Sequence, residues 1–513
     1  MDIETLLSFD WGAMMPEFII LGVATLLSLL DLFLKKEFDR RYLGWIGFAG
    51  ILVAIGFLVG TFESVGAGQP KVTSILHETF RLDSFAQSFK LLLLIGSALV
   101  MLMAISYEPK EGIKTYRGEF YYLFLTALLG TMFMASSGDL ITLFIGLELL
   151  SLSSYILAGI RKYHGPSNES AMKYVINGAI ATAITLFGMS YVFGLTGTTN
   201  LLEMQQILMQ AYATELQHML LIGFIMMFVG LSFKLATVPF HMWAPDVYEG
   251  APTPVAAFLG VVSKAAGFVI VLRIFVTLFI MTPAEGGETS MFLSLQEFLA
   301  IIAVASMVIG NVVALRQRNV KRMLAYSSIG HAGYILVAVT TLNFLYMFDA
   351  IWFYLLAYLF MSIGAFAVVQ IVTTKYGTED VSVFAGLYRR SPALAVIMSI
   401  FLLSLAGIPG TAGFIAKVNI FISAISEPSN AYVLASVLIA TTVVSYVYYF
   451  GIMTQMFFRP TADEEKVDIP VPMWIVLVIG VIGTVILGIM PNIALDFFHN
   501  YFNILYDFFL PGQ

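Results

Sequence analysis

Long apolar segments recur along the whole chain, separated by short stretches that hold most of the charged residues. A transmembrane helix needs about 20 predominantly apolar residues. On that template the sequence predicts about fourteen membrane-spanning helices. Their centres lie near residues 24, 53, 95, 128, 150, 184, 227, 266, 303, 332, 359, 408, 444 and 480. The pattern therefore predicts an all-α polytopic membrane protein.

Two of the predicted spans are interrupted by proline and glycine. The seventh contains Pro239 and Pro245, and the twelfth contains Pro409 between Gly407 and Gly410. Proline removes a helical hydrogen bond and frees a carbonyl group. In a membrane such backbone is tolerated only where it is buried in protein or lines a hydrated cavity. Both spans are therefore expected to be broken helices.

The two breaks align without gaps, as KLATVPF in the seventh span and SLAGIPG in the twelfth. A second similarity links SSYILAG in the fifth span to AGYILVA in the tenth. Because an odd number of steps separates the broken spans, they cross the membrane in opposite directions, as in inverted-repeat transporters. These similarities predict an inverted repeat, with one broken span in each half.

Charged residues are scarce and unevenly placed. They make up 12% of the chain, whereas a soluble domain carries about 25%. Basic residues cluster after odd-numbered spans, as in residues 35–41 and 316–322, and only Lys71, Arg81 and Lys90 are expected on the other side. By the positive-inside rule, both termini are expected outside the cytoplasm.

The composition excludes several kinds of chemistry. The chain has no cysteine, so it cannot supply thiolate ligands to zinc or iron–sulfur clusters. Its six histidines are scattered, and it has no phosphate-binding loop, no dinucleotide-binding glycine motif and no basic patch for nucleic acid. We therefore expect no cofactor in this chain and place any redox chemistry on other subunits.

Four charged residues lie inside apolar spans: Glu148, Lys234, Lys264 and Lys417. A charge near the bilayer centre costs about 2.5–3.5 kcal/mol even on lenient scales, and such residues commonly mark ion pathways. Structural roles are the alternatives, with Glu148 as a counter-ion and the lysines reaching the interface or the carbonyls of a broken helix. We favour a role in moving charge, most simply protons, through the membrane.

The remaining polar residues in or near the spans are harder to assign. His241 follows the first break and His331 lies in YSSIGHAGY, and each is either a packing residue or part of the path. Arg273 is expected to reach a head group or a surface partner. Asp246 and Glu249 are expected to fix a turn. Ser327 and Ser328, with Tyr326, either hydrate the path or bond backbone carbonyls, and we favour the second role.

Three stretches carry a resemblance to a known family: VPFHMWAPDVYEGAPTPVAAFLGVVSKAAGF, VKRMLAYSSIGHAGY and LAGIPGTAGFIAK. They resemble the antiporter-like subunits of proton-pumping NADH–quinone oxidoreductase (respiratory complex I), and the N type among them. The lysine in VVSKAAG, the lysine rather than glutamate in span twelve, and a chain that ends soon after span fourteen distinguish this type from the L and M types.

The resemblance implies three N-terminal spans in residues 1–110, inverted five-helix repeats in 111–285 and 286–460, and a last span with a C-terminal tail in 461–513. It also implies a half-channel in each repeat. It implies that Glu148 and Lys234 form an interacting pair, that Lys264 is the central relay, that Lys417 is the exit-side lysine, and that His331 lies on the polar axis. It also implies that quinone, FMN, NADH and iron–sulfur clusters bind to partner subunits. The expected neighbours in the bilayer are an M-type subunit and small subunits of the K, J and A types.

Two other functions remain open from the residues. A subunit of a multisubunit Na⁺/H⁺ antiporter would share the fold and the lysine pattern, although a sodium route is expected to carry more carboxylates than Glu148 alone. A non-pumping scaffold would have no use for four buried charges.

Overall fold

The structure is a computed structural model that describes residues 9–35, 37–62, 72–109, 113, 116–210, 217–282, 290–344, 346–426, 431–460 and 465–512. Lys71 lies outside the described residues. The expected domain boundaries at 110–111, 285–286 and 461 also fall on residues outside them.

The N-terminal part holds three long helices and a short hairpin that the sequence did not predict. In order, its elements are η1 (Trp11–Met14), α2 (Met15–Phe33), α3 (Arg41–Gly60), β1 (Thr73–Ile75), β2 (Phe80–Leu82) and α4 (Ser84–Ser106). The two strands pair antiparallel, with Ser74 opposite Arg81.

The elements of the expected first repeat are α5 (Arg117–Ser136), α6 (Leu140–Ala158), α7 (Gly165–Thr196), α8 (Leu201–Gln210), α9 (Gln217–Leu235), α10 (Trp243–Gly250), α11 (Thr253–Phe258), the π-helical turn η4 (Leu259–Ser263) and α12 (Lys264–Phe279). Those of the second are α13 (Met291–Ser294), α14 (Gln296–Ala314), α15 (Val320–Thr341), α16 (Met347–Tyr376), η5 (Val381–Phe384), α17 (Leu387–Arg390), α18 (Pro392–Ala406), α19 (Ala412–Ile425) and α20 (Tyr432–Phe458). The chain continues through α21 (Val471–Ile489), α22 (Asn492–Tyr501) and α23 (Ile504–Phe508).

Within the described residues, 13 helical segments are long and apolar enough to cross a membrane. The shorter apolar helices α18 and α19 are the two halves of a further, broken span. The protein is thus an all-α polytopic membrane protein, and the expected count of about fourteen spans is compatible with it.

The backbone repeats itself over α5–α7 and α14–α16. Asp139 caps α6 as Asn319 caps α15, and Gly197 ends α7 in the left-handed conformation as Gly377 ends α16. Asp139 forms an isolated β-bridge with Asn200, three places beyond Gly197. Asn319 forms the equivalent bridge with Asp380, three places beyond Gly377. Both equivalences give an offset of 180 residues (319 − 139 and 377 − 197). The sequence similarity that aligns SSYILAG with AGYILVA gives an offset that differs from this structural offset by one residue.

Both expected breaks are present. Helix α9 ends at Leu235, and the left-handed Ala236 (φ 57°) turns the chain toward α10. Helix α18 ends at Ala406, followed by Gly407 with φ 84°, a conformation that glycine adopts without a steric penalty. Asp246 and Glu249, expected in a turn, lie instead in α10.

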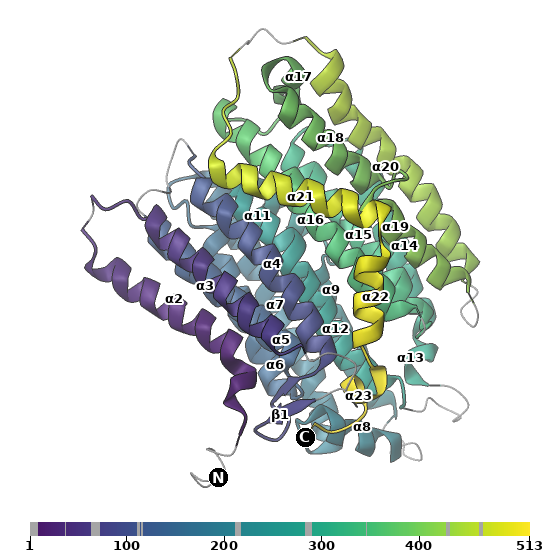
Figure 1. The fold of residues 1–513 in the computed structure, drawn as a ribbon. Helices are drawn as coiled ribbons and strands as arrows, with labels where there is room; N and C mark the ends of the chain where they lie inside the picture. The colour runs from purple at the N-terminus through teal and green to yellow at the C-terminus, as the bar shows by residue number, and fades with distance from the viewer. Residues whose placement is uncertain are drawn as a thin grey trace.

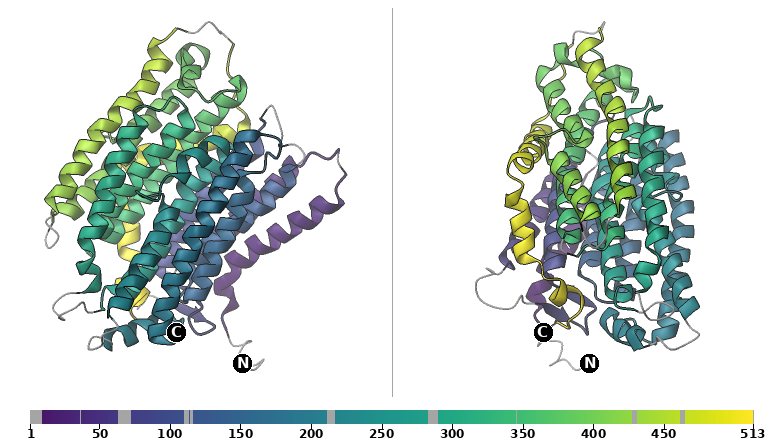
Figure 2. Two further views of the ribbon diagram at one scale, coloured as in Figure 1. Left: turned by 180° about the vertical axis from the view of Figure 1, so that it is seen from behind. Right: turned by 90° about the vertical axis from the view of Figure 1, so that its right-hand side faces the viewer.

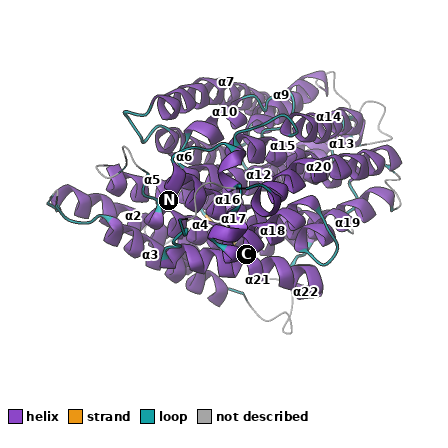
Figure 3. Cartoon of the chain, turned by 90° about the horizontal axis from the view of Figure 1, so that it is seen from above, coloured by secondary structure: helices purple, strands orange, loops and turns teal. Residues whose placement is uncertain are grey.

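The helices lie side by side in one bundle (Figure 1). Helices α2 and α3 form one edge and α20 the opposite edge, while α21 crosses the front and α22 and α23 lead back toward the hairpin. The views from behind and from the side show the same long helices running between the two ends of the bundle (Figure 2). Seen from above, α12 and α16 lie in the middle (Figure 3). The core of the protein is therefore built around the helix that carries Lys264.

Candidate functional site

The three intramembrane lysines each lie beside irregular backbone. Lys234 is in the last turn of α9, Lys264 directly follows the π-helical turn, and Lys417 lies early in α19 after the break. Their exposed fractions are 5%, 1% and 5%. Among the described residues, none of the three has a carboxylate oxygen within 4.0 Å.

Lys264 is bound by a serine of the other repeat. Its Nζ donates to the carbonyl oxygen of Ser328 at 2.6 Å and also to the Ser328 hydroxyl. The Tyr248 hydroxyl lies 3.4 Å from the same Ser328 Oγ. The sequence favoured a role for Ser328 in bonding backbone carbonyls. In the structure Ser328, which belongs to α15, instead joins α12 and α10 to α15 by hydrogen bonds.

Lys234 lies near Glu148 without forming an ion pair with it. Lys234 Nζ donates to Ser151 Oγ at 3.2 Å, and Ser151 lies one helical turn beyond Glu148. Glu148 is partly exposed and accepts a hydrogen bond from Thr182 Oγ1 at 2.8 Å. A Cβ on Gly267 would lie 3.5 Å from Lys234 Cγ, so this side chain runs along α12 one turn beyond Lys264.

Lys417 reaches back to the break in its own span. Its Nζ donates to the carbonyl oxygens of Leu405 and Ala406, at 3.1 and 3.0 Å. These carbonyls are free because the break removes their helical partners. The ammonium also lies 5.1 Å from the centre of the Tyr334 ring. That ring stands edge-on to His331, with ring centroids 5.6 Å apart.

His331 is held between two tyrosines. Its Nδ1 lies 2.7 Å from the Tyr354 hydroxyl and its Nε2 lies 3.3 Å from the Tyr449 hydroxyl. Tyr449 is in turn hydrogen-bonded to Ser327, one turn before His331 on α15. The structure thus places His331 between Lys264 and Lys417. These tyrosines were not identified from the sequence, since hydroxyl groups are common in membrane helices.

His241 stands apart from this group. It is buried in the turn between α9 and α10, and its Nδ1 has no hydrogen-bond partner among the described residues. No hydrogen bond within the described chain joins it to any of the three lysines.

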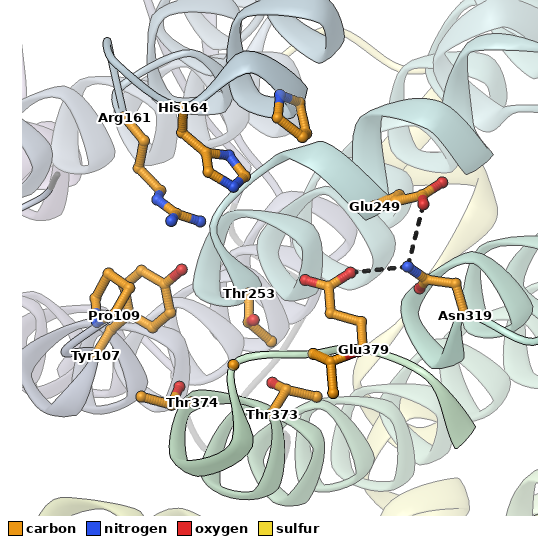
Figure 4. Close-up of a pocket in the computed structure, with 13 residues that line it drawn as sticks. Tyr107, Pro109, Arg161, His164, Glu249, Thr253, Asn319, Thr373, Thr374 and Glu379 are labelled. Carbon is orange, nitrogen blue, oxygen red and sulfur yellow. Dashed lines mark hydrogen bonds between the residues drawn. The ribbon is translucent and has the colours of Figure 1, made fainter. Parts of the chain in front are cut away.

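A pocket of about 430 Å³ opens at the end of the bundle where the basic loops lie. Arg161 and His164 line one side of it, and Glu249 and Glu379 face them across the opening (Figure 4). Asn319 donates to both carboxylates, at 3.2 and 3.0 Å. Both expected repeats contribute lining residues. Glu249 lies near the end of α10, from which the chain continues to α11 and Lys264.

Two predictions about charged residues are wrong. Arg273 is 2% exposed and forms a two-pronged ion pair with Asp83, at 2.6 and 2.9 Å, so it reaches neither a head group nor a surface partner. Lys90 lies inside α4 rather than in a loop, is fully buried, and pairs with Glu17 of α2 at 2.5 Å. Within the described residues, no group of three or more His, Asp or Glu side chains is arranged to hold a metal ion.

Comparisons with known proteins place the chain in a family. The family model described as "NADH:quinone oxidoreductase/Mrp antiporter, TM" matches residues 137–445. NADH-quinone oxidoreductase subunit N of Anoxybacillus flavithermus is 62% identical over 498 residues, which cover 97% of this chain and 98% of that protein.

Two solved structures are similar to this chain over nearly its whole length. A chain of respiratory complex I from Thermus thermophilus has a TM-score of 0.76 and 31% identity, with 94% of this chain and 99% of that chain covered. A chain of the Mrp complex from Dietzia sp. has a TM-score of 0.81 over 99% of this chain and 98% of that chain, but only 19% identity, so it is similar in fold alone.

Proposed function

The chain belongs to the NADH–quinone oxidoreductase subunit N family, and we propose that it carries protons across a membrane along Lys234, Lys264, His331 and Lys417. It is a subunit of a multisubunit membrane enzyme and contains no redox centre of its own in this proposal. Quinone reduction elsewhere in the complex supplies the energy, and the charge on Glu148 transmits it to the lysines.

The observation that carries the proposal is the set of contacts around the three lysines. Each is buried and, among the residues that the structure describes, lacks a carboxylate within 4.0 Å and is hydrogen-bonded only to neutral oxygen atoms. An unpaired buried ammonium is costly, so such a lysine can exchange its proton instead of holding it permanently. A lysine in a structural ion pair would instead keep its proton, because the neighbouring carboxylate stabilises the ammonium.

The pocket at the basic end supports a route by which protons reach Lys264. Its wall includes Glu249, and the neighbouring Tyr248 lies 3.4 Å from Ser328 Oγ, which accepts from Lys264. A proton taken up in the pocket would pass through these hydroxyls to the lysine. From Lys264 it would continue past Ser328 to His331, one turn further along α15, and then toward Lys417.

Glu148 acts as the controlling charge. Two unit charges 4 Å apart attract by about 4 kcal/mol at an effective dielectric near 20. Because Glu148 and Lys234 form no contact within 4.0 Å, their attraction lies below this figure. Neutralising or displacing Glu148 would still remove part of the stabilisation of the Lys234 ammonium and favour transfer of its proton to Lys264.

Membership of the family supports a proposal for the setting of the subunit. We place it in a bacterial plasma membrane, with the basic loops in the cytoplasm and both ends of the chain outside. Residues 1–110, 111–285, 286–460 and 461–513 form the N-terminal spans, the two inverted repeats and the last span with its tail. Its neighbours would be an M-type subunit and small subunits of the K, J and A types, with quinone, FMN, NADH and iron–sulfur clusters bound by partner subunits.

Substitutions of Lys264 test the proposal. In the complex reconstituted into vesicles, Lys264→Ala and Lys264→Arg are both expected to lower proton uptake per quinone reduced, because arginine keeps the charge but cannot release its proton. The exposed Lys466→Ala is the matched control and should pump normally. Full pumping by Lys264→Arg would show that the position needs only a positive charge, which would overturn the relay.

A further inference from the structure

A second group of buried charges lies at the end of the bundle opposite the pocket. The pocket is lined by Tyr107 at the end of α4, whereas this group surrounds the beginning of α4, about 34 Å away along the helix. Its members come from α2, the hairpin, α4, α12 and α23, and all are at most 9% exposed. They are Glu17, Glu78, Arg81, Asp83, Lys90, Arg273 and Asp507.

The charges in this group do not balance. It contains three cations and four carboxylates, and six of the seven charges are paired. The pairs are Glu17 with Lys90 at 2.5 Å, Glu78 with Arg81 at 2.9 Å, and Asp83 with Arg273 at 2.6 Å. Among the described residues the carboxyl group of Asp507 has no cation within 4.0 Å.

Neutral donors surround the Asp507 carboxyl group. Ser84 Oγ lies 2.9 and 2.8 Å from its two oxygens, and the Ser84 and Asn503 amides lie 3.2 and 3.3 Å away. The nearby Arg273 donates two bonds to Asp83 and gives Asp507 only a bond to its backbone carbonyl, at 3.0 Å. A buried carboxylate without a cation is unfavourable, whereas a carboxylic acid here can donate to Ser84 Oγ.

The same contacts hold the C-terminal segment, residues 503–512, against the hairpin. Arg81 donates to the backbone carbonyls of Tyr506 and Leu510, and the Gly512 amide donates to Glu78 at 2.7 Å. The Phe508 ring packs on Phe85, with centroids 5.0 Å apart. Docking of this segment is what buries Asp507.

We infer that this interface is a proton-binding site centred on the Asp507 carboxyl group, and that the C-terminal segment docks with that group protonated. The site lies outside the lysine axis and does not depend on the function proposed above. Binding one proton makes the seven charges sum to zero, which is the state a buried cluster favours.

Burial, and then the negative charge of Asp83, raise the pKa of Asp507 to about 8. Asp83 stays ionised, because Arg273 and Arg81 outweigh the effect of its burial and hold its pKa below the usual range. The docked segment therefore binds a proton that the free segment, with an ordinary carboxyl pKa of 3.8, has lost at neutral pH. Since the docked pKa is raised, docking is strongest at low pH and weakens by up to about tenfold per pH unit until the pH passes the docked pKa.

Other titratable groups also lie near the C-terminal segment. Helix α16 presents Asp349 beside Phe348, which packs on Phe508, and Asp349 is bonded to His499 of α22 at 2.9 Å. The hairpin and α4 contribute Glu78, Asp83 and Lys90, and α2 contributes Glu17, all of them ion-paired as described.

Hydrogen–deuterium exchange of the assembled complex in nanodiscs tests the inference. Protection of the α23 amides, expressed relative to an unstructured peptide at the same pH, is expected to fall between about pH 6 and about pH 8, by up to about tenfold per unit. Asp507→Asn carries a neutral side chain of the same shape, so its segment should stay protected and lose this pH dependence. Asp496→Asn, at an exposed position of α22, is the matched control and should behave as the wild type.

Two results would overturn the proton site. One is wild-type protection that does not change with pH. The other is an Asp507→Asn variant whose segment is unprotected at every pH, because this would mean that docking needs the carboxylate. Infrared difference spectra give an independent readout, in which a protonated-carboxyl band should titrate in the wild type and be absent from Asp507→Asn.

Discussion

Ser328→Ala is expected to impair proton transport while leaving the fold intact. The Ser328 hydroxyl is one of two acceptors that Lys264 Nζ contacts, the other being the Ser328 carbonyl oxygen at 2.6 Å. A hydrogen bond to a charged group contributes about 1.5–3 kcal/mol. Removing this hydrogen bond raises the free energy of the charged form of Lys264 by that amount. The ratio of charged to neutral lysine then falls by roughly ten- to 150-fold.

The assay is proton uptake by vesicles containing the reconstituted complex, divided by the rate of quinone reduction and measured across a range of pH. Ser328→Ala should pump several-fold less than the wild type near neutral pH and recover as the pH is lowered, because a higher proton concentration refills Lys264. Ser328→Thr, which keeps a hydroxyl, should retain most of the activity. Ser399→Ala removes a buried serine whose hydroxyl bonds only its own helix, and it serves as the control.

Unchanged pumping by Ser328→Ala at every pH would refute this reasoning, since it would mean that the hydroxyl does not influence the proton on Lys264. A loss of pumping that is equal at all pH values would also contradict it. Such a loss would point to a disturbed packing of α15 against its neighbouring helices.

Three further outcomes are expected. Glu148→Gln keeps a partner for Thr182 but removes the charge, so proton uptake per quinone reduced should fall several-fold, and normal uptake would rule out a controlling charge. Arg273→Gln leaves Asp83 without its two-pronged partner and should destabilise the subunit by about 3–5 kcal/mol, seen as a lower thermal midpoint. Gly413→Ala would place a Cβ 1.8 Å from the Ser404 carbonyl oxygen and should reduce assembly, whereas Gly451→Ala, with nothing within 4 Å, should not.

The sequence contained enough to predict the architecture and to find the lysines. Apolar runs of span length report on the bilayer, and a charge within such a run stands out without knowledge of the fold. The proline and glycine of the twelfth span likewise located a break, and the structure places Lys417 against the carbonyls that this break frees. These features depend on residues close together in the chain.

The partners of the lysines could not be predicted, because they come from distant segments. Ser328 lies 64 positions from Lys264 and Ser151 lies 83 positions from Lys234. Serine and tyrosine are frequent in membrane helices, where most bond the backbone of their own helix. Only the folded arrangement, which brings Ser151 of α6 to Lys234 of α9 and Ser328 of α15 to Lys264 of α12, selects the few hydroxyls that face a lysine.

The errors at Lys90 and Arg273 have a different origin. Lys90 lies near the end of a span, where predicted boundaries are uncertain by several residues and a charge is readily assigned to a loop. The sequence places Arg273 within its span but toward the end, where a long side chain can reach the interface. In the structure α4 begins at Ser84, so that Lys90 is already in its second turn. Its partner Glu17 lies in the first turn of α2, where a carboxylate also suggests no more than a helix start.

The offset of 180 residues between the two halves explains why similar helices carry different chemistry. It pairs Glu148 with Ser328 and Ser151 with His331, so the same two positions on α6 and α15 face the lysines in both halves. In the first half these positions hold a carboxylate and a hydroxyl, and in the second a hydroxyl and an imidazole. Glu148 is the only carboxyl group among these four residues, and it is also the one of the four that is partly exposed at the surface of the chain. In the proposed mechanism a neighbouring subunit would act on Lys234 through Glu148, whereas the contacts that the described residues make with the other two lysines come from buried neutral groups.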